Sequence, residues 1–202
     1  MRKIILMTIC VLGSGFMLAG YAQKVGEFSY QASFPTGKFG DFIGKTSWVG
    51  FSGGGRGYLK SNEQLSIGGS LSWFYMADKK GKQTFTGPEG GVTTGNLTNF
   101  TNIYGLMAVI QYDLKKRNEK KVPYIRGGLG GAYQNQNSDI GIYRIQNDGF
   151  QFMMNAEAGV NFNMSANNGI VLAATYHYLP EASGMVTTSF FGIKLAVTSF
   201  SY

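Results

Sequence analysis

Residues 65–75 read Leu-Ser-Ile-Gly-Gly-Ser-Leu-Ser-Trp-Phe-Tyr, a stretch in which apolar residues alternate with small or polar ones. Successive side chains of a β-strand point to opposite faces, so this alternation predicts a strand whose apolar face ends in aromatic rings. The stretches 104–114, 150–162 and 170–178 show the same alternation, and no strong helical period follows residue 22. The pattern therefore predicts an all-β fold.

Eight strands are expected in all, because weaker alternation marks four further stretches. Each is long enough, at about 9–11 residues or more, for a tilted strand to cross a bilayer. The second face of these strands is small and polar and carries several charges, so we expect that it forms no hydrophobic core. A soluble sandwich or lipocalin-like barrel would instead need a polar exterior. We therefore predict an eight-stranded antiparallel up-and-down transmembrane β-barrel. The expected strands are 25–34, 47–59, 64–76, 102–114, 122–133, 149–163, 169–179 and 188–202.

The connections between these strands alternate in length. Membrane barrels have short periplasmic turns and longer external loops, and an even number of strands places both termini in the periplasm. The first connection is then external, and it is one of the longer ones. The short connections are 60–63, 115–121 and 164–168, and the mostly longer ones are 35–46, 77–101, 134–148 and 180–187.

The N-terminus predicts export. Arg2 and Lys3 precede an apolar run over 4–18, and small Gly20 and Ala22 stand at the −3 and −1 positions of a cleavage site, as in a secretory signal peptide. An uncleaved anchor is less favoured, because the run is shorter than about 20 residues. We predict a cleaved signal peptide at 1–22 and an outer-membrane barrel domain at 23–202. Cleavage would also remove Cys10, the only cysteine of the chain.

Composition supports a membrane barrel and excludes other classes. The chain has 30 glycines, 14% aromatic residues and only 14% charged residues, against about 25% charged in a soluble domain. Export and the lack of a dense basic cluster with stacking aromatics argue against a nucleic-acid partner. We expect no metal and no other cofactor, because no His, Cys and carboxylate residues have metal-ligand spacing. The glycine clusters are followed by no helix, so a phosphate-binding loop is rejected.

The alternation turns charged side chains toward the lumen. Eight strands leave an interior that side chains just fill, and unpaired buried charges are costly. We therefore expect a hydrogen-bonded network, with an ion pair between Arg126 and Glu157, that plugs the barrel; a selective pore is the alternative. His177, the only histidine, has no identifiable serine partner, so we expect a structural role and no enzymatic activity. The predicted lumen network is Glu27, Arg56, Arg126, Glu157, His177 and Lys194.

Aromatic residues near the strand ends predict two girdles at the membrane interfaces, where amphipathic rings lie at headgroup depth. For the external rim these are Trp73, Tyr75, Tyr104, Tyr133, Tyr176 and Tyr178. For the periplasmic rim they are Tyr58, Tyr112, Tyr124 and Phe162. The basic turn 115–121 is interpreted as a solvated periplasmic turn.

Residues 34–37 (Phe-Pro-Thr-Gly), residues 122–130 (Val-Pro-Tyr-Ile-Arg-Gly-Gly-Leu-Gly) and the terminal Tyr202 carry a family resemblance. The chain resembles the eight-stranded OmpA/OmpX and opacity-protein superfamily, specifically the outer-membrane β-barrel proteins common in Bacteroidetes. The resemblance implies that the barrel assembly machinery reads Phe200 and Tyr202 as an assembly signal. These two residues are out of phase with the outward stripe 191–197, so either a bulge near Thr198 shifts the phase or the terminal aromatics point inward.

Two functions remain open at this point. The first is a structural anchor that displays its external loops for interaction, and the second is a small-solute porin or narrow channel. The expected partners are outer-membrane lipid and lipopolysaccharide, with periplasmic chaperones and the barrel assembly machinery during biogenesis. The loops contain no motif that identifies an external ligand.

Overall fold

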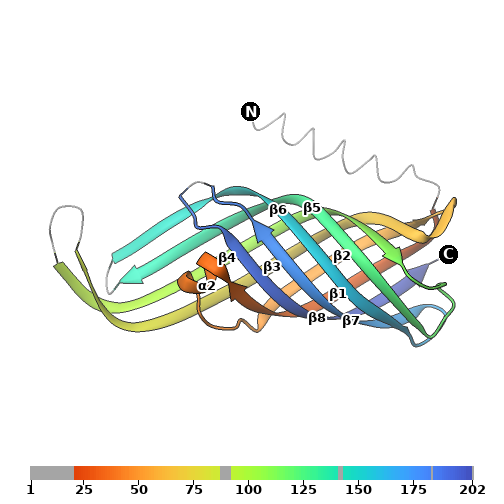
Figure 1. Cartoon of the computed structure of the whole chain (residues 1–202), viewed down its shortest axis with the longest axis horizontal. Helices are drawn as coiled ribbons and strands as arrows, with labels where there is room; N and C mark the ends of the chain where they lie inside the picture. The colour runs from red at the N-terminus through yellow and green to blue at the C-terminus, as the bar shows by residue number, and fades with distance from the viewer. Residues whose placement is uncertain (1–20, 87–91, 141–142, 183, 202) are drawn as a thin grey trace, which may run out of the picture.

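The protein is a closed barrel of eight antiparallel strands, each paired with its neighbour in sequence and β8 paired with β1 (Figure 1). The computed structural model describes residues 21–86, 92–140, 143–182 and 184–201. The predicted fold is confirmed, while the expected signal peptide lies almost entirely outside the described residues and stays a prediction. The strands are β1 (Tyr21–Thr36), β2 (Val49–Leu59), β3 (Asn62–Thr86), β4 (Val92–Asp113), β5 (Lys121–Ile140), β6 (Tyr143–Asn163), β7 (Asn168–Leu179) and β8 (Thr188–Ser201).

The outer wall of the barrel is apolar. Along β8, for example, Ile193, Leu195 and Val197 are exposed, whereas the intervening Lys194 and Ala196 are buried. An exposed apolar band around a closed sheet is the surface of a barrel that faces lipid. Within the described part of the chain, no helix has the length and apolarity that a membrane-spanning helix needs.

Strands β3 to β6 are longer than the sequence predicted. Residues 77–86, 92–101, 134–140 and 143–148 were expected in loops but continue these strands as two long hairpins (Figure 1). Their side chains are rich in Thr, Asn, Gln and Lys, and most of those that are buried on the inner face, such as Asn99, Thr101 and Gln134, are polar. A search for apolar stripes therefore does not find them.

The two hairpins form one four-stranded sheet that projects from the barrel, at the end opposite to the one where β1 begins and β8 ends (Figure 1). We call residues 77–86, 92–101, 134–140 and 143–148 the projecting sheet. Pairing of β2 with β3 ends at Tyr75, and pairing of β7 with β6 begins at Met154. Within the described residues, the projecting sheet thus has one open edge on β3 and another on β6.

A short helix, α2 (Gly37–Phe42), folds into the mouth of the barrel directly after β1. Gly37 has a φ of 57°, a left-handed conformation that glycine adopts most readily, and it starts the inward turn. The helix is held from the projecting sheet, where the Asn99 amide donates to the Phe42 carbonyl at 2.7 Å. Asp78 accepts from the Gly44 N–H at 3.1 Å and pairs with Lys45 at 3.5 Å.

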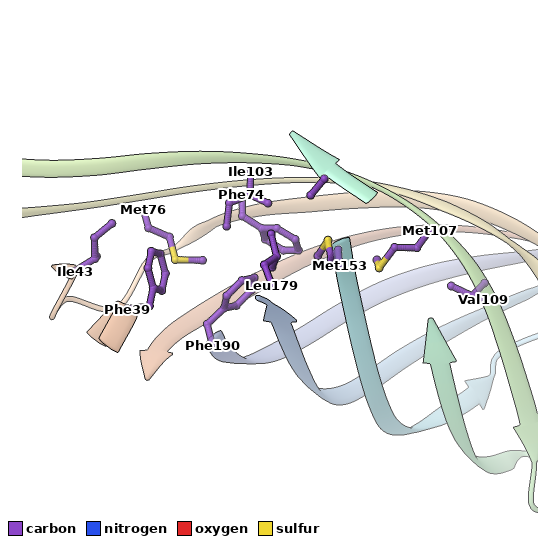
Figure 2. Close-up of a cluster of buried hydrophobic side chains, with 11 residues drawn as sticks. Phe39, Ile43, Phe74, Met76, Ile103, Met107, Val109, Met153, Leu179 and Phe190 are labelled. Atoms are coloured by element: carbon purple, nitrogen blue, oxygen red, sulfur yellow. The ribbon is translucent and has the colours of Figure 1, made fainter. Parts of the chain in front are cut away.

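The lumen beneath α2 is apolar, which corrects the expectation that the inner face forms no hydrophobic core. The outward stripes dominated the pattern analysis, whereas Phe74 and Ile103 occupy the alternate, inward positions. We call this cluster the apolar plug (Figure 2). It comprises Phe39, Ile43, Phe74, Met76, Ile103, Met107, Val109, Ala132, Met153, Leu179 and Phe190. A second, smaller cluster of buried residues lies in the half with the short turns and comprises Tyr124, Val171, Ala173 and Ala196.

Candidate functional site

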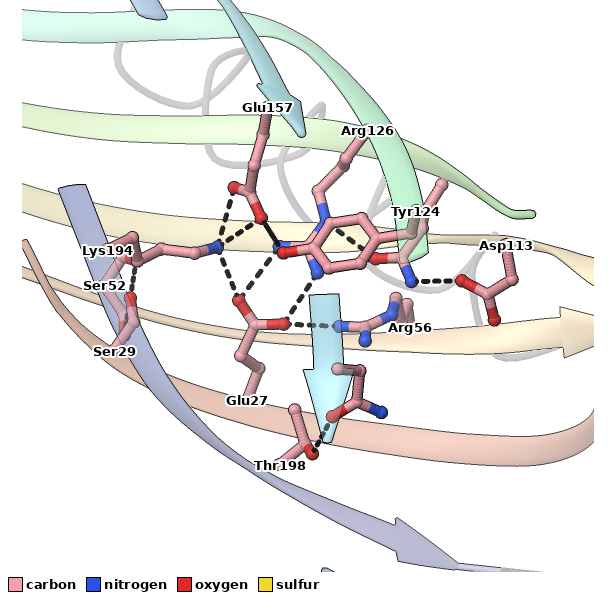
Figure 3. Close-up of polar contacts among 12 residues, drawn as sticks. Glu27, Ser29, Ser52, Arg56, Asp113, Tyr124, Arg126, Glu157, Lys194 and Thr198 are labelled. Atoms are coloured by element: carbon pink, nitrogen blue, oxygen red, sulfur yellow. Dashed lines mark hydrogen bonds and ion pairs between the residues drawn. The ribbon is translucent and has the colours of Figure 1, made fainter. Parts of the chain in front are cut away.

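Glu27 is the centre of a charge network in the middle of the lumen (Figure 3). Its carboxylate accepts from Arg56 at 2.7 Å, from Arg126 at 2.9 and 2.7 Å, and from Lys194 at 2.9 Å. These side chains come from β1, β2, β5 and β8, and all four are buried. One carboxylate therefore ties together strands from around the barrel.

Glu157 of β6 is the second anion of the network. Lys194 lies 2.6 Å from its Oε1 and donates to its Oε2 at 2.7 Å, and the expected ion pair with Arg126 is present at 3.4 Å. The Tyr124 hydroxyl also donates to Glu157. The three cations Arg56, Arg126 and Lys194 thus share two carboxylates, and the buried Asp113 lies nearby, beyond Gln111.

Two neighbours of the network were missed by the sequence analysis. Gln111 accepts from Arg126 Nε at 2.9 Å and Nη2 at 2.6 Å, and it donates to Asp113 at 2.7 Å. The Tyr58 hydroxyl donates to the same Asp113. The signal was present, because Gln111 and Asp113 share the inward phase of β4 with Val109, but neither was assigned to the lumen network.

His177 faces the lumen as predicted but does not join the ion pairs. Its ring stacks on Phe190, with centroids 4.6 Å apart, and lies 5.0 Å from the ring of Phe74. Its Nε2 is 3.4 Å from the Gln31 side-chain oxygen. The histidine therefore lies where the charge network meets the apolar plug, and it packs as an aromatic ring.

The lumen is closed by the apolar plug, by the charge network and by the contacts of Arg117 at the end with the short turns. The apolar plug fills the loop side, and the charge network crosses the middle. Between them is a cavity of about 30 Å³ that Gln31, Thr175 and His177 help to line, which is the volume for a water molecule or two. At the other end Arg117 donates to Gln23 at 2.6 Å, and its guanidinium lies 4.5 Å from the ring centroid of Tyr58.

Most of the predicted girdle aromatics lie on the outer wall, but Tyr124 is a correction. It is buried and donates to Glu157, because it shares the inward phase of β5 with Arg126. Tyr58 is inside for the same reason. Tyr58 and Tyr124 were assigned to the girdle because they lie near strand ends, although the alternation of side chains along each strand places both of them inside the barrel. The outward-facing members are Trp73, Tyr75, Tyr104, Tyr112, Tyr133, Tyr176 and Tyr178.

The phase of the last strand is also resolved. Pairing of β8 with β1 runs without a break from Thr36–Ser189 to Lys24–Ser201, so the bulge considered near Thr198 is absent. Phe200 is therefore in the inward phase of β8, two residues beyond Thr198. Tyr202 lies outside the described residues, and the role of both residues in assembly stays a prediction.

The projecting sheet carries its own charge pair. Arg144 donates to both oxygens of Asp139 at 2.7 and 2.9 Å, and its guanidinium lies 5.6 Å from the ring centroid of Phe100. The hydrogen bond from Arg144 lowers the pKa of the Asp139 carboxyl. Tyr143 and Ile145 of the β6 edge are exposed. The sheet thus presents polar, charged and apolar side chains beside an unpaired edge.

The β3 edge differs from the β6 edge. Its ladder with β4 is interrupted between Lys79 and Gly81, and Lys79, Lys80 and Lys82 follow one another closely along it. Bulges and lysines are the usual means by which proteins block pairing at a sheet edge. Pairing of β5 with β6 is regular throughout, so the β6 edge lacks that protection. Among the described residues, no group of three His, Cys, Asp or Glu side chains could hold a metal ion.

Comparisons with known proteins identify the fold. No protein-family model matches the sequence, and no curated protein matches it significantly. Among solved structures, the chain is similar to Neisserial surface protein A, with a TM-score of 0.55 at 11% identity over 88% of this chain and 95% of that one. A major outer membrane protein from Thermus thermophilus gives a TM-score of 0.52 at 11% identity, covering 87% and 99%. The chain therefore has the fold of the outer-membrane β-barrels.

Proposed function

We propose that this barrel is a closed outer-membrane anchor that displays the projecting sheet at the cell surface for interaction with an external partner. The observation that carries the proposal is a contrast along the barrel axis. The lumen is filled by the apolar plug and the charge network, whereas β3 to β6 continue beyond the barrel mouth as an ordered sheet.

The filled lumen argues against the porin alternative. A solute path would have to displace α2, which is held by Asn99 and Asp78, and then separate the cations from Glu27. Separating a buried ion pair leaves uncompensated charge and costs about 3–5 kcal/mol. Most of the lumen is therefore structural filling that stiffens the anchor.

The projecting sheet is the part of the molecule suited to recognition. Edge strands offer unpaired backbone N–H and C=O groups that another extended chain can pair with. The regular β6 edge, with exposed Tyr143 and Ile145, offers both backbone pairing and apolar contact. Outer-membrane lipid and lipopolysaccharide would surround the wall, and chaperones and the barrel assembly machinery would act during biogenesis.

The proposal sets an orientation that single cysteines can test. The chain after the expected signal peptide has no cysteine, so Thr84→Cys on the projecting sheet and Lys60→Cys on a short turn each add one thiol. In intact Gram-negative cells, a membrane-impermeant maleimide should label Thr84→Cys and leave Lys60→Cys unlabelled. Both should react after the outer membrane is permeabilised. Labelling of Lys60→Cys alone in intact cells would overturn the orientation and the display role.

A further inference from the structure

The cavity between the charge network and the apolar plug is lined by polar atoms that lack partners. Its volume is about 30 Å³, and the small side chains of Ser52, Ser72 and Thr175 are part of its wall. Four buried side chains of the lining each have an atom with no hydrogen-bond partner within the described residues. These atoms are Arg56 Nε, Ser72 Oγ, Thr175 Oγ1 and His177 Nδ1. Because buried polar groups are nearly always hydrogen-bonded, this group of atoms indicates a site for a polar species.

Most of these unpartnered atoms can donate a hydrogen bond. Arg56 Nε carries a hydrogen and cannot accept, and the hydroxyls of Ser72 and Thr175 can each turn a hydrogen toward the cavity. His177 Nδ1 carries a hydrogen in one of its two neutral tautomers. Asn155 Oδ1 also lines the cavity without a partner, and rotation of this amide by half a turn presents its NH2 group instead. The lining therefore suits a species that accepts several hydrogen bonds.

The carboxylates of the charge network cannot accept from these donors, because their oxygens are already engaged. An ionised carboxylate has about four lone-pair sites, and Glu27 accepts two hydrogen bonds at each of its oxygens. Glu157 accepts from Tyr124 at one oxygen and from Lys194 at the other. The donors that face the cavity therefore need an acceptor other than these two side chains.

The charged side chains of the lining do not balance. The lining contains three cations and two carboxylates, which are Arg56, Arg126, Lys194, Glu27 and Glu157. Asp113 lies outside the lining, on the opposite side of the network from Lys194 (Figure 3). Tyr58 and Gln111 donate to it there. With His177 counted as neutral, the cavity thus has one positive charge in excess, and an unbalanced buried charge is costly.

We propose that this cavity binds a small monovalent anion of the size of chloride, which completes the charge network of the lumen. Arg56, Ser72 and Thr175 would donate to the anion, and the excess positive charge of the lining would balance it. The bound anion would satisfy buried donors, which are costly to leave without a partner. Such an anion would stabilise the barrel whatever the projecting sheet binds.

The dependence of stability on the anion tests the site. The full barrel is unfolded by urea in lipid vesicles while sodium gluconate, a salt of a much larger anion, is replaced by sodium chloride at constant ionic strength. A ligand that binds only the folded state stabilises it by mass action, so the unfolding equilibrium constant should fall about ten-fold for each ten-fold rise in chloride above its Kd. Bromide should act like chloride. Equal stability in chloride and gluconate would overturn the proposal.

Ser72→Ala and its matched control, Ser66→Ala, separate the site from a general effect of salt. Both serines are buried on the inner face of β3, and neither hydroxyl has a partner within the described residues, but Ser72 alone lines the cavity. Ser72→Ala should weaken chloride binding several-fold, and Ser66→Ala should leave it unchanged. Heat-modifiable migration checks that each variant is folded. Equal effects of the two substitutions would place the action of chloride elsewhere and contradict the site.

Asn155→Asp tests the charge requirement without removing a donor from Arg56, Ser72 or Thr175. The new carboxylate would supply a fixed negative charge in the wall of the cavity, so the stability of this variant should no longer depend on chloride. Crystals grown in sodium bromide locate the ion by its anomalous scattering. We expect a bromide peak in the cavity of the wild type and none in Asn155→Asp. A wild-type cavity without bromide would identify the bound species as water and overturn the proposal.

Discussion

The lumen and the projecting sheet each contain an arginine that donates to both oxygens of a carboxylate. Arg126 reaches Glu27 at 2.9 and 2.7 Å, and Arg144 reaches Asp139 at 2.7 and 2.9 Å. The side chain of Arg126 is 7% exposed and that of Arg144 is 58% exposed. Water screens the outer pair, whereas the inner pair has no solvent to replace a lost partner. The two ion pairs therefore have the same hydrogen-bond geometry, but loss of the buried pair should cost far more stability than loss of the exposed pair.

Arg126→Ala should give the largest loss of stability, about 3–5 kcal/mol. The substitution removes donors to Glu27 and Gln111 and weakens the compensation of Glu157. Unfolding of the barrel by guanidinium in lipid vesicles measures the loss. Arg144→Ala is the matched control and should leave the midpoint unchanged. Equal midpoints for the two variants would show that burial does not separate the two pairs.

Leu179→Ala should cost about 3 kcal/mol, because a fully buried side chain of the apolar plug leaves a cavity. Leu129→Ala is the control on the outer wall, where the side chain faces lipid and its removal leaves no enclosed cavity. The same unfolding measurement compares them. A larger loss for Leu129→Ala would mean that the inner cluster contributes less than the lipid-facing wall.

Phe39→Ala should act locally. Phe39 is the only buried residue of α2, so its loss should release the helix from the barrel mouth while the ladder of strands stays intact. Hydrogen exchange of residues 37–44 should become several-fold faster, and the global midpoint should change little. The exposed Lys38→Ala should alter neither. Unchanged exchange in Phe39→Ala would mean that Asn99 and Asp78 alone hold the helix.

The smallest effect concerns pH on the projecting sheet. Arg144 lowers the pKa of Asp139 from its ordinary value of 3.8. The pair therefore stabilises the sheet at pH values above the ordinary pKa of Asp139. This stabilisation is lost as the pH falls through the lowered pKa. A carbon NMR titration of the Asp139 carboxyl should give a midpoint below 3.8 that rises in Arg144→Ala. If Arg144→Ala left the titration midpoint of Asp139 unchanged, Arg144 and Asp139 would not be paired in solution.

The barrel wall could be predicted from sequence because lipid requires an apolar residue at every second position, as at Ile193, Leu195 and Val197. The projecting sheet could not, because most of its buried side chains, such as Asn99, Thr101 and Gln134, are polar and form no apolar stripe. The apolar plug was hidden for a different reason. Phe74 and Ile103 stand between the outward apolar residues, so their stretches look apolar on both faces, and only the closed barrel shows which residues meet inside.

Tyr124 is a member of the lumen network that the sequence could have predicted. It stands two residues before Arg126, so phase alone places both on the same face, yet its nearness to the strand end suggested the girdle. The partners of Glu27 could not have been predicted in this way. Arg56, Arg126 and Lys194 come from three other strands, and their convergence depends on barrel closure and side-chain length, which the linear pattern does not contain.

Single-channel recording in planar bilayers tests the closed anchor most directly. Wild-type protein should give no steady conductance, because the apolar plug and the charge network both block the lumen. A variant in which a Gly-Ser linker replaces residues 37–44 and Ala replaces Phe190 serves as the opened control and should show current steps. Stable, long-lived openings in the wild type, comparable to those of the opened control, would contradict the account and favour the porin.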